Sequence, residues 1–103
     1  MSLDNLKLNQ YKIEQRSEAI RFLKEVTGQV DLAVSMKDFD GLTRMAHEMS
    51  GAMRVSSNMG VFTSEEDERI MAATRGIGQA IVNKSWTTAE INARLLEDAV
   101  ASL

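Results

Sequence analysis

No proline interrupts this chain of 103 residues, so its backbone can stay helical over the whole length. The apolar residues recur mainly at steps of three and four, the spacing that gathers side chains on one face of an α-helix. We therefore expect an all-α fold. The length is that of one ordinary domain, and no repeat or linker divides the chain. Residues 1–103 are thus predicted to form a single helical domain, with residues 1–8 disordered or frayed.

Four segments carry the helical pattern, and short connections separate them. They cover residues 9–35, 38–58, 63–84 and 85–103. Connections of a few residues favour antiparallel neighbours, so the pattern predicts an antiparallel bundle of three to four helices. A chain of this size has a modest core, and dimerisation is one way to complete it. In the alternative arrangement, the first helix is long, protrudes and pairs with its copy in a homodimer.

Helix-capping residues mark where the second and third segments begin. Asp38 is a good N-cap, because its carboxylate can accept a hydrogen bond from the first turn. At the start of the third segment, either Thr63 with Glu66 or Ser64 with Asp67 has the spacing of a capping box. These signals predict helices that begin directly after residue 38 and after residue 63 or 64.

The end of the second segment and the start of the fourth carry similar signals. Gly60 is placed to end the second helix in the left-handed region. Thr87 with Glu90 predicts a capping box, and Trp86 before it is expected to pack on Ile91 as a hydrophobic staple.

The composition excludes several classes of function. With no cysteine and one histidine, the chain can form neither a disulfide nor a thiolate zinc site, and we predict no metal and no cofactor. A net charge of −3 without a basic stretch argues against nucleic-acid binding. No apolar run is long enough to span a membrane, and no secretory signal is visible, so we expect a cytoplasmic protein. Because no catalytic constellation is recognisable, we expect no enzymatic activity.

The single histidine, His47, lies on the polar side of the second segment and is expected to be exposed. The stretch LTRMAHEMSGAM, residues 42–53, resembles the core motif of histidine phosphotransfer (HPt) domains through Ala46, His47, Met49 and Gly51. The resemblance implies a helical bundle in which His47 accepts a phosphoryl group from a response regulator. Gly51 would then leave room for the partner.

Two further residues qualify and extend that resemblance. Ser50 occupies the position where the HPt motif has a lysine, so the cation expected to neutralise the phosphate is absent from this helix. Arg44, one turn before His47, is placed to steady an anion.

Methionines are concentrated in the second segment. They are Met45, Met49, Met53 and Met59. Methionine is flexible and polarisable and is common on surfaces that adapt to partners, so these four residues are predicted to bind a partner. Filling the core of the bundle is the alternative role for the same residues.

Together these features predict a small non-enzymatic regulatory or adaptor protein that binds another protein through its helices, for example an inhibitor or anti-activator of a larger factor. A phosphotransfer domain with His47 as the acceptor is the first alternative. A small enzyme or ligand-binding protein with its site at a dimer interface is the second.

Overall fold

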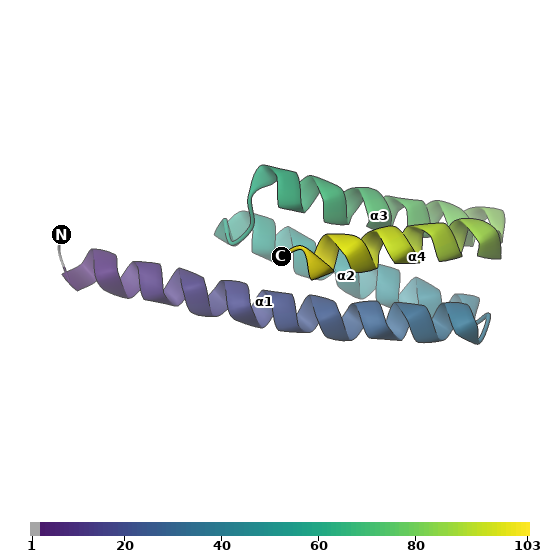
Figure 1. Cartoon of the computed structure of the whole chain (residues 1–103), viewed down its shortest axis with the longest axis horizontal. Coiled ribbons are helices and arrows are strands. Elements are labelled where there is room, and N and C mark those ends of the chain that lie inside the picture. Colours follow the sequence, from purple (N-terminus) through teal and green to yellow (C-terminus); the bar gives the residue numbers. More distant parts are fainter. Residues whose placement is uncertain (1–2) are drawn as a thin grey trace.

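In a computed structural model, the chain folds into four α-helices joined by short turns (Figure 1). The structure describes the backbone of residues 3–103 and the side chains of residues 13–103. The helices are α1 (Leu3–Ser35), α2 (Phe39–Met59), α3 (Ser64–Asn83) and α4 (Trp86–Ala101). Within the described residues, none of them combines the length and the apolar composition needed to cross a membrane.

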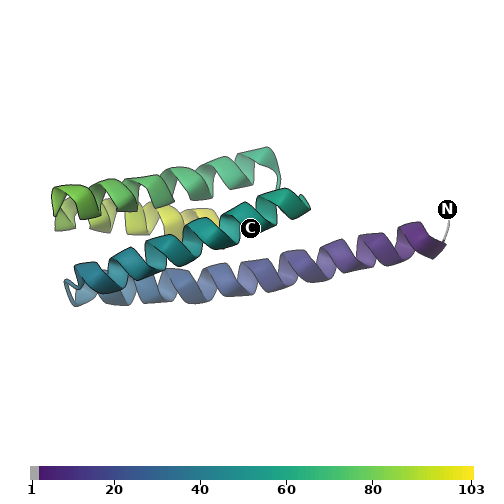
Figure 2. The ribbon, with the colours of Figure 1, turned by 180° about the vertical axis from the view of Figure 1, so that it is seen from behind.

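The helices form an antiparallel bundle, which confirms the predicted all-α architecture. Helix α1 packs against α2 and α4, and α3 packs against the same two helices from the other side. Each helix therefore has two neighbours, and the backbones of the diagonal pairs do not approach closely within the described part of the chain. The molecule is elongated, measuring 53 × 20 × 20 Å (Figures 1 and 2).

The core runs along the axis of the bundle and takes side chains from all four helices. The largest fully buried side chains are Leu23, Val30, Leu42, Met49, Met53, Ile70, Ile77 and Leu96. Burying such a side chain contributes roughly 1.5–3 kcal/mol, so this aliphatic column is the main source of stability. Alanines on α3 and α4, including Ala80 and Ala89, are also fully buried and let these two helices pack closely.

Helix α1 is longer than the sequence predicted. It begins at Leu3 rather than near residue 9, so residues 3–8, expected to be disordered or frayed, are helical, while residues 1 and 2 lie outside the described part. The helix continues through Gly28 to Ser35 without interruption. Its N-terminal part extends beyond the ends of the other three helices (Figures 1 and 2).

The predicted caps of α2 and α3 are confirmed. The Asp38 carboxylate accepts a hydrogen bond from the Gly41 amide at 3.0 Å. Gly60 ends α2 with φ of +66°, a left-handed conformation that glycine adopts without strain. Of the two candidate capping boxes, the pair Thr63–Glu66 is the one formed, with reciprocal bonds of 2.9 and 3.1 Å.

The predicted start of α4 is wrong by two residues. Ser85, not Thr87, is the N-cap, and its hydroxyl oxygen accepts a hydrogen bond from the Thr88 amide. Trp86, expected to pack on Ile91, stacks on Phe39 of α2 with ring centroids 3.9 Å apart, and Ile91 is 56% exposed. Trp86 packs on Phe39 because a second aromatic ring offers a larger contact area than Ile91. Stacked rings also gain energy beyond that from buried area.

A glycine sets the spacing between α3 and α4. A Cβ at Gly76 would collide with the side-chain amide of Asn92, which donates a hydrogen bond to the Thr88 carbonyl at 2.9 Å. Gly76 thus permits the two helices to approach closely. Gly78, two residues later, has open space where its Cβ would be, so it serves no such purpose.

Arg16 joins three separate parts of the bundle at one end. Its guanidinium donates to both carboxylate oxygens of Glu66, at 2.9 and 2.7 Å, and to the Val61 carbonyl at 2.9 Å. It also reaches the backbone oxygen of Leu103 at 3.4 Å and lies over the Phe62 ring, 5.2 Å from its centroid. The side chain therefore connects α1 to the α2–α3 turn and to the end of α4.

Candidate functional site

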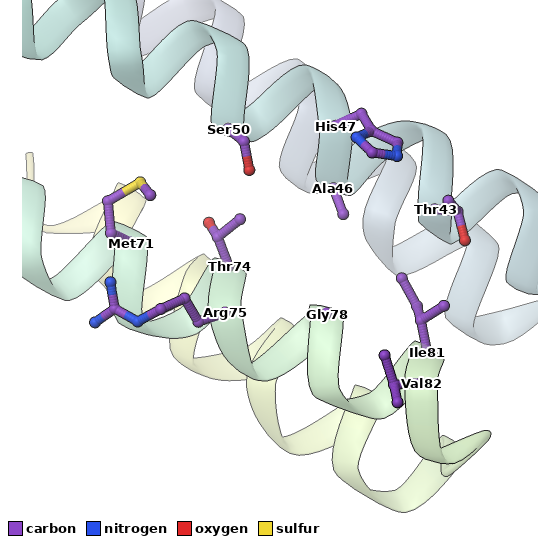
Figure 3. Close-up of a pocket in the computed structure, with 10 residues that line it drawn as sticks. All are labelled: Thr43, Ala46, His47, Ser50, Met71, Thr74, Arg75, Gly78, Ile81 and Val82. Atoms are coloured by element: carbon purple, nitrogen blue, oxygen red, sulfur yellow. The ribbon is translucent and has the colours of Figure 1, made fainter.

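His47 lies in the middle of α2, with an exposed imidazole, as the sequence predicted. It borders an open groove between α2 and α3 with a volume of about 380 Å³ (Figure 3). We call this the His47 groove. Its lining residues are Thr43, Ala46, His47, Ser50, Met71, Thr74, Arg75, Gly78, Ile81 and Val82.

The His47 groove has a mainly apolar floor and a polar rim. Ala46 and Ile81 point into the space between the two helices, while the His47 ring lies at its outer edge (Figure 3). The Thr43 and Thr74 hydroxyls already donate hydrogen bonds to carbonyls of their own helices, at 2.8 Å each. The other polar side chains that line the groove are His47, Ser50 and Arg75.

The arginine that lines the His47 groove comes from a different helix than the sequence suggested. Arg44 lies on the side of α2 that faces α1, where it lines a separate depression with Met36 and Met45. Arg75 of α3 instead lines the His47 groove, and its guanidinium is held by one exposed contact of 3.2 Å to Glu68. The Arg75 side chain extends toward Met71 rather than toward the His47 ring (Figure 3).

The predicted methionine surface is mostly part of the core. Met49 and Met53 are each 1% exposed, so they cannot contact a partner while the bundle is folded. Met45 and Met59 are half-buried and pack against the same core. The methionines are buried because α2 packs against both α1 and α3. Its whole apolar stripe is used in these two contacts. Core filling, the alternative role, is what the structure shows for Met49 and Met53.

A second groove lies on the opposite side of α2. The exposed apolar side chains beside it are not methionines. Phe22 of α1 is 40% exposed and Val55 of α2 is 58% exposed. They border an open depression between the two helices with a volume of about 450 Å³. We call it the Phe22 groove; its lining residues are Gln15, Glu18, Ala19, Phe22, Gly51, Ala52 and Val55.

Small residues make up part of the lining of the Phe22 groove, and acidic residues lie beside it. They are Ala19, Gly51 and Ala52, and nothing approaches the position of a Cβ at Gly51 within 4 Å. Glu18 lines the groove directly. Helical spacing places Glu25 three residues after Phe22 and Glu48 four residues before Ala52, each on the same helix face and each exposed.

The sequence contains one signal for this groove. The first segment has two consecutive large apolar residues, Phe22 and Leu23. Neighbouring positions on a helix point about 100° apart, so such a pair spans the width of the core-facing stripe and places one residue at its edge. Leu23 is 1% exposed and occupies the core, which leaves Phe22 at the surface.

Neither groove contains a metal site. Among the described residues, no three histidine, cysteine, aspartate or glutamate side chains gather closely enough to hold an ion. Comparisons of the chain with protein-family models, with curated proteins and with solved structures give no match. The geometry of the two grooves is therefore the feature that indicates a function.

Proposed function

We propose that this protein binds another protein by docking one of its helices in the Phe22 groove. The observation that carries the proposal is the pair Phe22 and Val55, which remain exposed on opposite sides of a groove lined by small residues. Grooves of this kind suit helix-in-groove recognition, in which apolar side chains one turn apart enter the depression. The role agrees with the regulatory or adaptor function expected from the sequence.

The small residues favour a helix as the bound element. Ala19, Gly51 and Ala52 allow the backbone of a partner to approach, as small residues do wherever helices pack closely. Phe22 supplies an aromatic anchor, the type of residue that dominates binding energy at interfaces.

The flanking charges favour a basic partner. Glu18 lines the groove, helical spacing places Glu25 and Glu48 one turn from residues that line it, and all three are exposed. Complementary charges at the rim of an interface raise the association rate and select the partner more than they raise affinity. We therefore infer an amphipathic helix with apolar residues on one face and lysine or arginine beside them.

Site-specific photo-crosslinking in the native host tests this proposal. A photoreactive amino acid replaces either Phe22 or Val55, and matched controls carry it at Ile91 or Leu95 of α4, which are 56% and 53% exposed. We expect one heterologous adduct at positions 22 and 55 that is absent at positions 91 and 95. Absence of any heterologous adduct at 22 and 55, or equal adducts at all four positions, would contradict the proposal.

His47 supports a second candidate function, phosphotransfer. The observation in its favour is an exposed histidine in the middle of a bundle helix, with Arg75 lining the same groove and open space at Gly51. In such a role, His47 accepts a phosphoryl group from an aspartyl phosphate, and Arg75 attracts the added charge.

Incubation with a phosphodonor tests the second candidate. Acetyl phosphate or a phosphorylated response regulator from the host would label the wild-type chain with an acid-labile phosphate. The His47→Gln variant would remain unlabelled with an unchanged thermal unfolding midpoint. No label on the wild type with any response regulator of the host excludes this function. The cytoplasmic location expected from the sequence stays a prediction.

A further inference from the structure

The Phe22 groove is one end of a longer face that α1 and α2 form together. Exposed residues follow one another on this face at steps of three and four, the spacing of neighbours on one side of a helix. On α1 they are Phe22, Glu25, Gln29, Leu32 and Met36, and on α2 they are Arg44, Glu48, Gly51 and Val55. We call these residues the α1–α2 face.

A second apolar depression lies at the other end of this face, beside the turn that joins the two helices. Leu32 and Met36, which are 52% and 69% exposed, line it together with Met45. Its volume is about 160 Å³, and we call it the Leu32 depression. Figures 1 and 2 show α1 and α2 meeting at their turn and diverging toward the end of α2, where the larger Phe22 groove lies.

The charge on the α1–α2 face changes along its length. Glu18 lines the Phe22 groove, and the exposed Glu25 and Glu48 lie between this groove and the Leu32 depression. The depression itself is charge-balanced, because Arg44 and Asp38 both line it. The face is therefore acidic from the Phe22 groove to its middle and carries no excess of negative charge at the far end.

The separation of the two apolar ends determines the spacing of side chains that could enter both. Leu32 and Met36 follow Phe22 by 10 and 14 residues on α1, which corresponds to about 15 and 21 Å. In a second helix lying along this face, residues 11 positions apart are about 16.5 Å apart and point to the same side. A step of seven residues spans only about 10.5 Å and is too short.

We propose that the helix docked in the Phe22 groove continues along the α1–α2 face and places a second apolar residue in the Leu32 depression. This inference rests on the function proposed above and specifies the partner. The partner helix carries two large apolar residues about 11 positions apart, with lysine or arginine between them on the same side. The basic residues lie opposite Glu25 and Glu48, as charge complementarity requires. Two anchors also fix the line along which the helix lies, which one anchor cannot do.

Photo-crosslinking at both ends of the face tests the proposal. A photoreactive amino acid at Met36 should capture the same partner as one at Phe22, and the control at Val82, which is 76% exposed on α3, should not. Peptide mapping should place the two attachment sites roughly three turns apart in one helical segment of the partner.

The possible failures are distinguishable. An adduct at position 22 without one at position 36, or attachment sites in separate segments, would overturn the two-anchor proposal and leave docking in the Phe22 groove intact. Absence of a heterologous adduct at position 22 would overturn both proposals. Adducts with a second copy of this chain at both positions would overturn the choice of a basic partner.

Calorimetry with a synthetic peptide of the captured segment measures the second anchor separately. Replacing the apolar residue that cross-links to position 36 by alanine should weaken binding to the wild type about tenfold. The same replacement should have little effect on binding to Leu32→Ala/Met36→Ala, because that contact is already lost. The Val82→Ala chain should show the full wild-type loss. An equal loss in the wild type and in the Leu32/Met36 variant would show that the second residue binds elsewhere and would overturn the proposal.

Discussion

The Arg16 guanidinium and the Glu66 carboxylate form a bidentate salt bridge, with N–O distances of 2.9 and 2.7 Å. The two residues are far apart in the sequence. The same Glu66 oxygen that accepts from Arg16 also accepts from the Thr63 amide and completes the capping box of α3. One carboxylate thus fixes the start of α3 and holds α1 against it. Both side chains are partly exposed, so water screens the pair and limits its contribution.

Replacing Glu66 by glutamine is expected to destabilise the protein in a pH-dependent way. The hydrogen bonds from Arg16, followed by that from the Thr63 amide, lower the pKa of Glu66 from 4.5 to about 2. A lowered folded-state pKa stabilises the fold above the unfolded value, and this stabilisation disappears as the pH falls toward 2. At neutral pH, we expect Glu66→Gln to cost about 1–2 kcal/mol from the weakened ion pair and cap.

Chemical denaturation at several pH values measures this effect. The difference between wild type and Glu66→Gln should shrink steadily between pH 4.5 and about 2. Glu68→Gln is the control, because Glu68 makes only the exposed contact to Arg75 and should change stability by less than about 0.5 kcal/mol. A pH-independent difference for Glu66→Gln would contradict the assigned pKa.

Asp31 should show the opposite dependence. Burial, followed by the nearby charge of Glu97, raises the pKa of the Asp31 carboxyl. The folded state therefore binds this proton more tightly than the unfolded state, so ionised Asp31 destabilises the fold at neutral pH. Asp31→Asn is expected to raise the thermal midpoint at pH 7, and the gain should diminish as the pH is lowered through the raised pKa. A gain that grows with acidification would show that the sign is wrong.

Truncating Met49 tests whether the methionines of α2 belong to the core. Met49 is 1% exposed, and Met49→Ala should cost about 2–5 kcal/mol through lost burial and the cavity that remains. Met36→Ala is the matched control, because Met36 is 69% exposed and its truncation should change stability by less than about 0.5 kcal/mol. Urea titrations of both variants provide the comparison. Similar values for the two would place Met49 outside the core.

The two neighbouring glycines of α3 should respond to alanine in opposite ways. Gly76→Ala would collide with the Asn92 side chain and break its bond to Thr88, and this cost of about 1–3 kcal/mol is expected to exceed the gain in helix propensity. Gly78→Ala has free space and should stabilise the helix by about 0.5–1 kcal/mol, the difference in helix propensity. Thermal melts distinguish the two, and a gain for both variants would show that α3 and α4 are less closely packed at Gly76.

Local signals in the sequence were enough to predict the helical bundle. The caps at Asp38 and Gly60 and the capping box at Thr63 each involve residues within one turn, so their chemistry can be recognised without a structure. At the start of α4 the same reasoning failed, because Trp86 gains more from stacking on the distant Phe39 than from a local staple. Contacts between segments therefore decided the outcome where two local signals competed.

The candidate site was less predictable for the same reason. Exposure of His47 follows from its position opposite the apolar stripe, and the sequence predicted it. The packing of α3 beside α2 decides which arginine lines the His47 groove. No spacing within one helix contains that information. The Phe22 groove likewise forms only when α1 and α2 pack together.

We propose that the face of α1 and α2 around Phe22 binds a basic amphipathic helix. A calorimetric titration with the helical segment of the partner trapped at position 22 tests this directly. We expect saturable binding that weakens with salt, is lost in Phe22→Glu/Val55→Glu, and persists in Ile91→Glu/Leu95→Glu. Binding that survives the groove substitutions, or that the α4 substitutions abolish instead, would contradict it.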